Sequence, residues 1–197
     1  MGGRSGAVIY SPGSKTWRKI SGKRVSASTL DGKGNIWLGT QGNGILVFNT
    51  QGKQIGQYTA EDNEITGNVV FHLRYDQVQK RVFAATRTGL SVYEEEARQW
   101  IKLIDPEKES VKKTFSGTYV LHTAFDKDGN AWVSSNGGLD VFNVDLKLVR
   151  QFSSDTDTGM ISRTIVTGVA IGKEGSKWIS TLSNGIYQYD GKTFHHF

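Results

Sequence analysis

The sequence contains no cysteine and only 2 proline residues among its 197 residues. Without cysteine the chain can form no disulfide framework, no zinc ribbon and no thiol nucleophile. No apolar run approaches the roughly 18 residues that a membrane-spanning helix needs. The N-terminal sequence Met-Gly-Gly-Arg-Ser-Gly has no apolar core, so we expect no signal peptide within this sequence. A protein of this kind is either cytosolic or is exported by a leader that lies outside this segment.

Charge is unevenly distributed along a chain whose 37% hydrophobic and 11% aromatic residues are enough for a folded core. Residues 1–60 hold eight basic residues against Asp31 alone, a net charge of +7, whereas the remaining residues hold 16 basic and 18 acidic ones. A basic segment can attract phosphate, an anionic glycan or an acidic protein surface. The plainer interpretation is a solubilising face or a guarded edge strand. No nucleic-acid-binding motif accompanies the charge, so we expect no nucleic-acid partner.

The chain repeats itself. A first element with an aromatic residue at its centre occurs four times, and the aromatic residues are spaced by 46, 49 and 46 positions. These residues are Trp37, Phe83, Trp132 and Trp178. A second element, glycine followed by an aliphatic residue and then an aromatic one, comes after each first element and begins at Gly44, Gly89, Gly138 and Gly185. A fifth copy of the second element begins at Gly6. The sequence therefore holds four full units and an N-terminal half unit.

Each unit reads as four short β-strands bounded by Gly, Asn or Asp. The predicted inner strands are Val25–Leu30, Val70–Tyr75, Val120–Phe125 and Val166–Ile171, and the predicted fourth strands are Gln54–Thr59, Gln99–Ile104, Leu148–Ser153 and Thr193–Phe197, with Thr16–Ser21 in the half unit. Four strands in about 46 residues, repeated, predict the blades of a β-propeller. We therefore predict a single all-β domain over 1–197, a propeller or open propeller segment of four four-stranded blades and a half blade. The units cover about 1–21, 22–63, 64–110, 111–159 and 160–197.

The repeated residues have structural roles in such a blade. Trp37, Trp132 and Trp178 are expected to fill the space between adjacent sheets. The glycines that open the third strand mark places where a neighbouring backbone comes close. Gly34 and Gly129 lie in Asp-x-x-Gly turns that call for a positive φ.

The string from Asp31 to Thr40, Asp-Gly-Lys-Gly-Asn-Ile-Trp-Leu-Gly-Thr, followed by Gly-Asn-Gly-Ile-Leu-Val-Phe-Asn, resembles the two-component regulator propeller repeat. The segment from Asp126 to Trp132 with Gly137 to Asn143 resembles it too. The second unit lacks the glycine and the tryptophan of the motif, and the fourth has Gly172 where the motif has aspartate. The resemblance implies a periplasmic or otherwise extracytoplasmic sensor segment of a bacterial hybrid two-component system. Members of this family often respond to glycan-derived ligands, so the resemblance implies a ligand of that kind. It also implies kinase or other domains in a longer chain.

Two histidines hold equivalent positions in consecutive units. His72 and His122 each lie four residues before an aspartate on an inner strand, and Arg74 follows the first. If these side chains face a central channel, they are the candidate ligand-binding residues, and two histidines there can act as acid and base. Streptogramin-lyase-like propellers use such a histidine, so a propeller lyase is the alternative function. The other units have Ala27 and Gly168 there and offer no third ligand, so we predict no metal site, no cofactor and no catalytic residue.

Several other features carry a plainer interpretation. Asp126-x-Asp128-Gly resembles the start of a calcium loop but lacks the distal acidic ligand. Glu94 to Glu96 and Lys108 to Lys113 read as solvated connections, and His195-His196 falls at a terminal strand. Among the aromatic residues outside the repeat core, three can stack on a sugar ring, Trp17, Trp100 and Phe115, but aromatic residues of fourth strands more often pack on the next blade.

The sequence thus predicts a sensor segment that binds an unknown small-molecule or glycan ligand and has no enzymatic activity. A protein-interaction scaffold without a small-molecule ligand is the third possibility. Because four and a half blades leave a ring open, the terminal units are expected to expose apolar faces and to associate with a neighbour or with a second copy.

Overall fold

The structure, a computed structural model, describes residues 2–3, 6–105, 107–108, 115–153 and 164–197. The chain forms two compact units. Unit 1 comprises Met1–Arg87 and Ser91–Lys102, and unit 2 comprises Thr88–Leu90 and Leu103–Phe197. The predicted boundaries of the repeats and the prediction of a single domain over 1–197 stay predictions.

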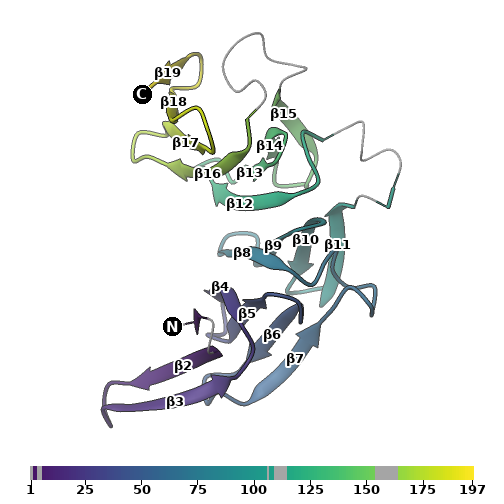
Figure 1. The fold of residues 1–197 in the computed structure, drawn as a ribbon, viewed down its shortest axis with the longest axis vertical. Helices are drawn as coiled ribbons and strands as arrows, with labels where there is room; N and C mark the ends of the chain where they lie inside the picture. Colours follow the sequence, from purple (N-terminus) through teal and green to yellow (C-terminus); the bar gives the residue numbers. More distant parts are fainter. Residues whose placement is uncertain (1, 4–5, 106, 109–114, 154–163) are drawn as a thin grey trace. The chain divides into compact units, whose positions relative to one another are not determined.

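The described residues form nineteen strands, all in antiparallel sheets (Figure 1). The N-terminal sheet has the order β1-β2-β3, with strands Gly2–Gly3, Gly6–Ser11 and Thr16–Ser21. The next sheet is β4-β5-β6-β7, with Val25–Leu30, Ile36–Thr40, Ile45–Phe48 and Gln54–Tyr58. It is followed by β8-β9-β10-β11, with Val70–Asp76, Arg81–Thr86, Gly89–Glu94 and Gln99–Ile104. The sheet β12-β13-β14-β15 contains Val120–Phe125, Ala131–Ser135, Gly138–Phe142 and Leu148–Ser153. The last, β16-β17-β18-β19, contains Val166–Ile171, Lys177–Thr181, Ile186–Tyr189 and Phe194–His196.

This arrangement confirms the predicted fold class, four four-stranded blades and an N-terminal half blade. The half blade differs in one respect, because the short strand β1 pairs with β2 through Gly2 and Ala7 and supplies a strand that the sequence did not suggest. The inner strands agree with the predicted ones to within one residue. Alternation of β-branched and polar residues between Gly and Asn turns is a strong local signal, which explains the agreement.

Gly44 and Gly138, at the start of the third strands of their sheets, lie against the fourth strands. A Cβ atom built on Gly44 would come within 2.1 Å of the Tyr58 carbonyl oxygen, and one built on Gly138 within 2.2 Å of the Phe152 carbonyl oxygen. Gly44 also has a positive φ of 66°. No L side chain fits this space, so the glycine sets how closely the third and fourth strands approach.

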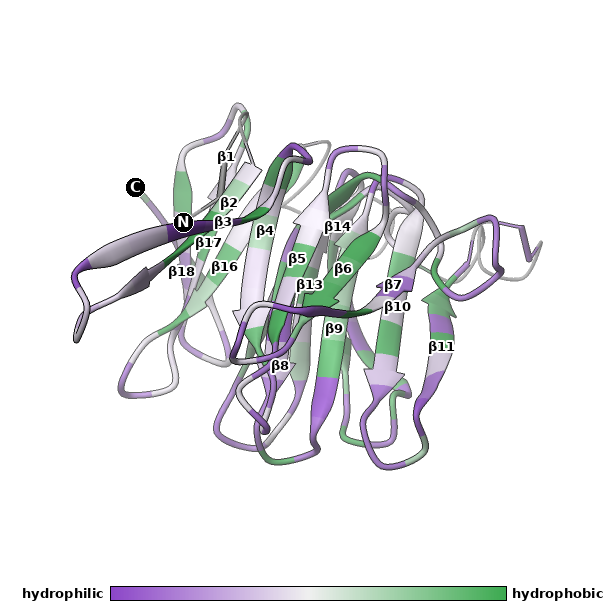
Figure 2. Ribbon diagram, turned by 90° about the horizontal axis from the view of Figure 1, so that it is seen from below, coloured by the Kyte–Doolittle hydropathy of each residue, from purple (hydrophilic) through white to green (hydrophobic). Residues whose placement is uncertain are grey.

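In unit 1, buried hydrophobic residues lie on both faces of the sheet β4-β5-β6-β7. All four residues of β6 are buried, and this strand carries hydrophobic colours in Figure 2. On one face Leu46 and Phe48 join Ala7 of the half blade. On the other face Ile45 and Val47 join Trp37 and residues of β8 to β10. Alternate residues of one strand therefore form two separate inter-sheet cores.

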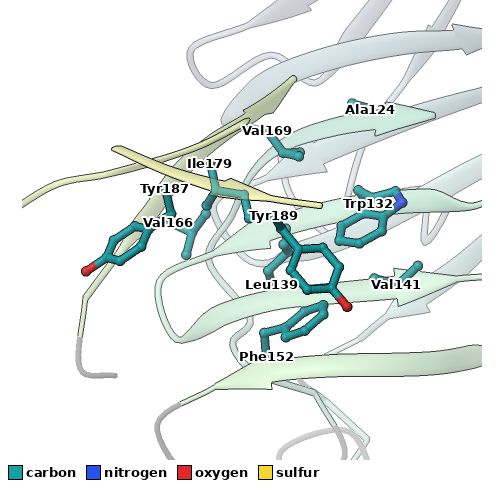
Figure 3. Packing of buried hydrophobic residues seen from close by; sticks show 10 residues of the cluster. All are labelled: Ala124, Trp132, Leu139, Val141, Phe152, Val166, Val169, Ile179, Tyr187 and Tyr189. Carbon is teal, nitrogen blue, oxygen red and sulfur yellow. The ribbon is translucent and has the colours of Figure 1, made fainter. Parts of the chain in front are cut away.

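In unit 2, one core lies between the sheets β12-β13-β14-β15 and β16-β17-β18-β19 (Figure 3). Trp132 and Phe152 of the first sheet contact Tyr189 of the second, with ring centroids 6.2 and 5.3 Å from it. Trp132 is only 4% exposed, as expected for a residue between sheets. Trp178 differs from that expectation, because it is 39% exposed.

Candidate functional site

The Asp-x-x-Gly turns are built around one carboxylate. Asp31 Oδ1 accepts hydrogen bonds from the backbone N–H groups of Lys33 (2.9 Å) and Asn35 (2.8 Å), and Oδ2 accepts from Asn35 Nδ2 and from Trp37 Nε1 (3.0 Å). Gly34 in this turn has the expected positive φ of 77°. Burial acts to raise the pKa of Asp31, but these hydrogen bonds outweigh it and hold the pKa below its ordinary value. These hydrogen bonds hold the turn in place, and they occupy both oxygen atoms of the Asp31 carboxylate.

This turn forms one wall of a cavity in unit 1. The cavity has a volume of about 560 Å³, within the range usual for small-molecule sites. Its other walls come from the end of β8 and from the connection between β10 and β11. The lining residues are Leu30, Asp31, Gly32, Lys33, Gly34, Tyr75, Gln77, Lys80 and Glu95.

Glu95 is the central polar group of this cavity. Its Oε1 atom lies 2.9 Å from Lys33 Nζ, and its Oε2 atom accepts a hydrogen bond of 2.8 Å from the Tyr75 hydroxyl. The Glu95 side chain is only 13% exposed. Burial, with the hydrogen bond to Glu95 and its negative charge, raises the pKa of Tyr75 to about 12, so the phenol stays protonated and donates. Gly32 leaves the space for this hydroxyl, because a Cβ there would lie 2.6 Å from it.

A smaller, aromatic-lined cavity of about 100 Å³ shares Asp31, Lys33 and Glu95 with the larger one. Its walls include Trp37, Tyr58 and Tyr93, whose ring centroids lie 5.1 to 5.6 Å apart. Burial and the hydrogen bond with Tyr93 raise the pKa of Tyr58. The larger cavity offers polar groups, and the smaller cavity next to it has aromatic walls. This combination suits a small polar ligand that has one apolar face.

The sequence-predicted ligand residues lie elsewhere. His72 and Arg74 lie on β8 of unit 1, where His72 pairs with Ala85 in register and Arg74 is exposed. His122 lies on β12 of unit 2 and pairs with Ser134. His122 lines a cavity of about 380 Å³ in unit 2, together with Gly168, Val169, Ala170, Trp178, Ser180 and Ile186. The assignment of His72, Arg74 and His122 to ligand binding stays a prediction.

The sequence interpretation of Glu94 to Glu96 as solvated connections is wrong for two of the three residues. Glu94 Oε1 lies 2.8 Å from Arg81 Nη2, with both side chains mostly buried, and Glu95 forms the cavity wall. Only Glu96, which pairs with Lys80, is well exposed. The partner of Glu95, Lys33, lies 62 positions earlier, so no local pattern could reveal the pair. Of the segment Lys108 to Lys113, residues 109–113 lie outside the described residues.

The three aromatic residues named as possible sugar platforms differ in their surroundings. Trp100 lies in the aromatic cluster of unit 1, and Phe115 packs on Phe142 at 5.6 Å. Trp17 is 59% exposed and contacts Tyr10, whose ring centroid lies 4.7 Å away. Trp17 is therefore the one of these three with an open face.

The calcium-like segment is a turn of the same kind as the one at Asp31. Asp126 accepts four hydrogen bonds, from the backbone N–H groups of Asp128 and Asn130, from Asn130 Nδ2 and from Trp132 Nε1 at 2.9 Å. A carboxylate that accepts four N–H donors has no lone pair directed at a cation. Within the described part of the chain, no group of three or more His, Asp or Glu residues is arranged to hold a metal ion.

Solved structures share this fold. The chain aligns over its whole length with two structures of the extracellular domain of BT4673 from B. thetaiotaomicron, described as a hybrid two-component system and as a one-component system, at TM-scores of 0.74 and 0.77 and identities of 16% and 18%. The extracellular domain of the hybrid two-component system BT3049 from the same organism aligns over 89% of the chain, with a TM-score of 0.52 and 20% identity. The chain spans about a quarter of the length of these three domains.

Another neighbour is an enzyme, an inactive variant of virginiamycin B lyase from Staphylococcus aureus with quinupristin. It has a TM-score of 0.64 and 15% identity, and the match covers 88% of this chain and 55% of the lyase. No protein-family model and no curated protein matches the sequence. Among the residues that the structure describes, no helix is long and apolar enough to cross a membrane. At these identities the comparisons show the fold alone, and it is the fold that the resemblance implies, shared with these extracellular domains and with the lyase.

Proposed function

We propose that the chain is an extracytoplasmic, ligand-binding segment of a bacterial two-component sensor and that it has no enzymatic activity of its own. The cavity of unit 1 is the observation that carries the proposal. It has the volume of a small-molecule site, and its buried carboxylate is held in place by Lys33 and Tyr75. The fold shared with extracellular sensor domains supports the same function and the same compartment.

The ligand that suits this cavity is small, polar and without net charge. Glu95 and Lys33 neutralise each other, Lys80 pairs with Glu96, and the Asp31 carboxylate accepts hydrogen bonds within its own turn, so little unpaired charge is left to select an ion. Glu95 offers acceptor lone pairs, and Lys33 and Gln77 offer donors. A hydroxyl-rich ligand such as a mono- or disaccharide released from a glycan would use both kinds of group, and its apolar ring face would meet the aromatic walls.

A thermal-shift panel of neutral mono- and disaccharides, followed by calorimetry on the hits, tests the proposal. Glu95→Gln and Tyr75→Phe should weaken binding of a hit by at least about tenfold, since each leaves a buried polar partner unsatisfied. Asp62→Asn is the matched control, because it removes the same charge from an exposed position of unit 1 that lines neither cavity, and it should leave the affinity unchanged. Equal affinities in all three variants would place the ligand elsewhere and disprove the proposed site.

A propeller lyase is the second candidate function, favoured by the lyase neighbour and by the cavity that His122 lines. A general acid or base contributes a factor of about 10² to 10⁴ to a rate. Assays with cyclic esters and lactones therefore distinguish the two functions. Cleavage by the purified protein that falls a hundredfold or more in His122→Ala would replace the sensor proposal with the enzyme.

A further inference from the structure

The N-terminal hairpin has one face turned to the core and one face exposed. Ala7 and Ile20 pack against the sheet β4-β5-β6-β7. Arg18 belongs to the same face as Ile20, because alternate residues of a strand share a face, and its guanidinium donates a hydrogen bond to the carbonyl oxygen of Gln51. These contacts fix the hairpin on unit 1 and leave its opposite face exposed.

An aromatic pair lies on the exposed face. Tyr10 and Trp17 are opposite each other in the register of β2 and β3, and they are 44% and 59% exposed. Their ring centroids are 4.7 Å apart with an interplanar angle of 38°. Large aromatic side chains usually bury most of their surface, so an exposed pair of this kind is the type of feature that marks a binding surface.

Lys19 and Lys15 lie near this pair, and Lys23 and Arg24 lie beyond the far end of β3. Lys19 lies two residues from Trp17 on the same strand and therefore on the same face, about 7 Å along it. Lys15 lies in the turn before β3, and Lys23 and Arg24 follow the last residue of β3. None of these four side chains forms an ion pair with a described residue. Asp31, the one acidic residue of the first 60, is occupied by its own turn.

We propose that this face, defined by Tyr10, Trp17 and Lys19 with Lys15 in the adjoining turn, binds an anionic polysaccharide chain. The C–H groups of a sugar ring pack on the electron-rich face of Trp17, and carboxylate or sulfate groups of the same chain lie near the unpaired lysines. Charge complementarity selects a polyanion, and the aromatic pair selects one built of rings. A nucleic-acid strand would stack successive bases on several aromatic platforms, whereas the hairpin offers one.

The hairpin face shares no residue with the lining of the unit 1 cavity, so the polysaccharide proposal and the proposed small-molecule site can be tested separately. Low-molecular-weight heparin and polygalacturonate are the probes, with neutral dextran, oligothymidylate and anionic phospholipid vesicles as comparisons. We expect the two anionic polysaccharides to bind, dextran not to bind, and the affinity for the polysaccharides to fall about tenfold between 50 and 200 mM salt, as for polyelectrolyte binding by a few basic residues.

Variants separate the aromatic and the charge contributions. Trp17→Ala should weaken binding about tenfold, the size of a lost stacking platform, whereas Trp17→Phe should keep most of it. Lys19→Gln should weaken binding and reduce its salt dependence, while Lys173→Gln, which removes a charge from an exposed site in unit 2, should have no effect. Both sites on the hairpin are exposed, so these variants should fold.

Three results would overturn the proposal. Equal binding of wild type and Trp17→Ala would reduce the effect to unspecific charge attraction. Tighter binding of oligothymidylate or of vesicles than of either polysaccharide would assign the surface to a different class of partner. The absence of polysaccharide binding at 50 mM salt would show that the hairpin face is not a polyanion site.

Discussion

Trp132 and Trp178 occupy the same position of the repeat and pair in the same way with the neighbouring strands, yet their surroundings differ. Trp132 is 4% exposed, contacts Tyr189, and donates its indole N–H to Asp126. Trp178 is 39% exposed and has Gly172 at the position of that aspartate. The comparison shows that the motif fixes the strand and its register, whereas the next sheet decides how much the tryptophan stabilises the fold.

The largest expected effect tests the comparison between Trp132 and Trp178 directly. Trp132→Ala should lower the free energy of unfolding by about 3–5 kcal/mol, the usual cost of a large truncation in a core. Trp178→Ala should lower it by about 1 kcal/mol or less, because its side chain loses fewer contacts. Urea denaturation of both variants measures the difference. Similar losses at the two sites would show that Trp178 is covered in solution, as the predicted self-association through the terminal faces would require.

Asp126 supplies the second difference between the two copies of the motif. Asp126→Ala should lower the free energy of unfolding by about 2 kcal/mol at pH 7, since Trp132 Nε1 and two backbone N–H groups lose a charged acceptor. Asp128→Ala is the control in the same turn, because the Asp128 side chain is exposed and makes no hydrogen bond in the described structure.

The cost of Asp126→Ala should depend on pH. Burial acts to raise the pKa of Asp126, but hydrogen bonds from Trp132, Asn130 and the backbone outweigh it and lower the pKa below 3.8. A depressed folded-state pKa gives stability that is fully present above 3.8 and is lost as the pH falls through the folded value. The gap between wild type and Asp126→Ala should therefore narrow below about pH 4. A gap that stays constant down to pH 2 would contradict this assignment.

The smallest expected effect comes from a substitution that restores the aspartate of the motif in the last sheet. Gly172→Asp should raise the free energy of unfolding by about 0.5–1 kcal/mol, through a new acceptor for the turn and a less flexible unfolded chain. A Cβ on Gly172 would lie 3.7 Å from Trp178 Nε1, and 2.6 Å from the Ser176 hydroxyl, which must rotate away. Gly175→Ala, at a positive φ of 82° in the same turn, should instead destabilise. A loss of stability in Gly172→Asp would show that the hydroxyl cannot move.

Local patterns predicted the strands well because each strand is short and is bounded by its own turn. The repeat glycines were also interpreted correctly as points of close approach, and Gly138 lies against the Phe152 carbonyl oxygen. The hydrogen bond that Trp37 Nε1 donates to the Asp31 carboxylate was not predicted, although both residues belong to the quoted motif and lie six positions apart across one turn. That contact could have been found from the sequence.

The candidate site could not be found in this way. Its central pair, Lys33 and Glu95, joins turns of two different sheets, and Tyr75 comes from a third segment. The sequence singled out His72 and His122 because they recur at equivalent positions, with Arg74 beside the first, and recurrence indicates a repeat rather than a cavity. Only His122 among them lines one of the cavities described above.

The sequence by itself determined the repeat, the strands, their order within each blade and the excess of positive charge near the N-terminus. These depend on neighbours a few residues apart, where side-chain alternation and turn chemistry act. The tertiary structure decided which face of a sheet is covered, so that Trp132 is buried and Trp178 is not, and it brought Glu95 to Lys33 and Tyr75. The physical reason is that burial and pairing across sheets depend on chain segments that are distant in sequence, and no local pattern records how those segments meet.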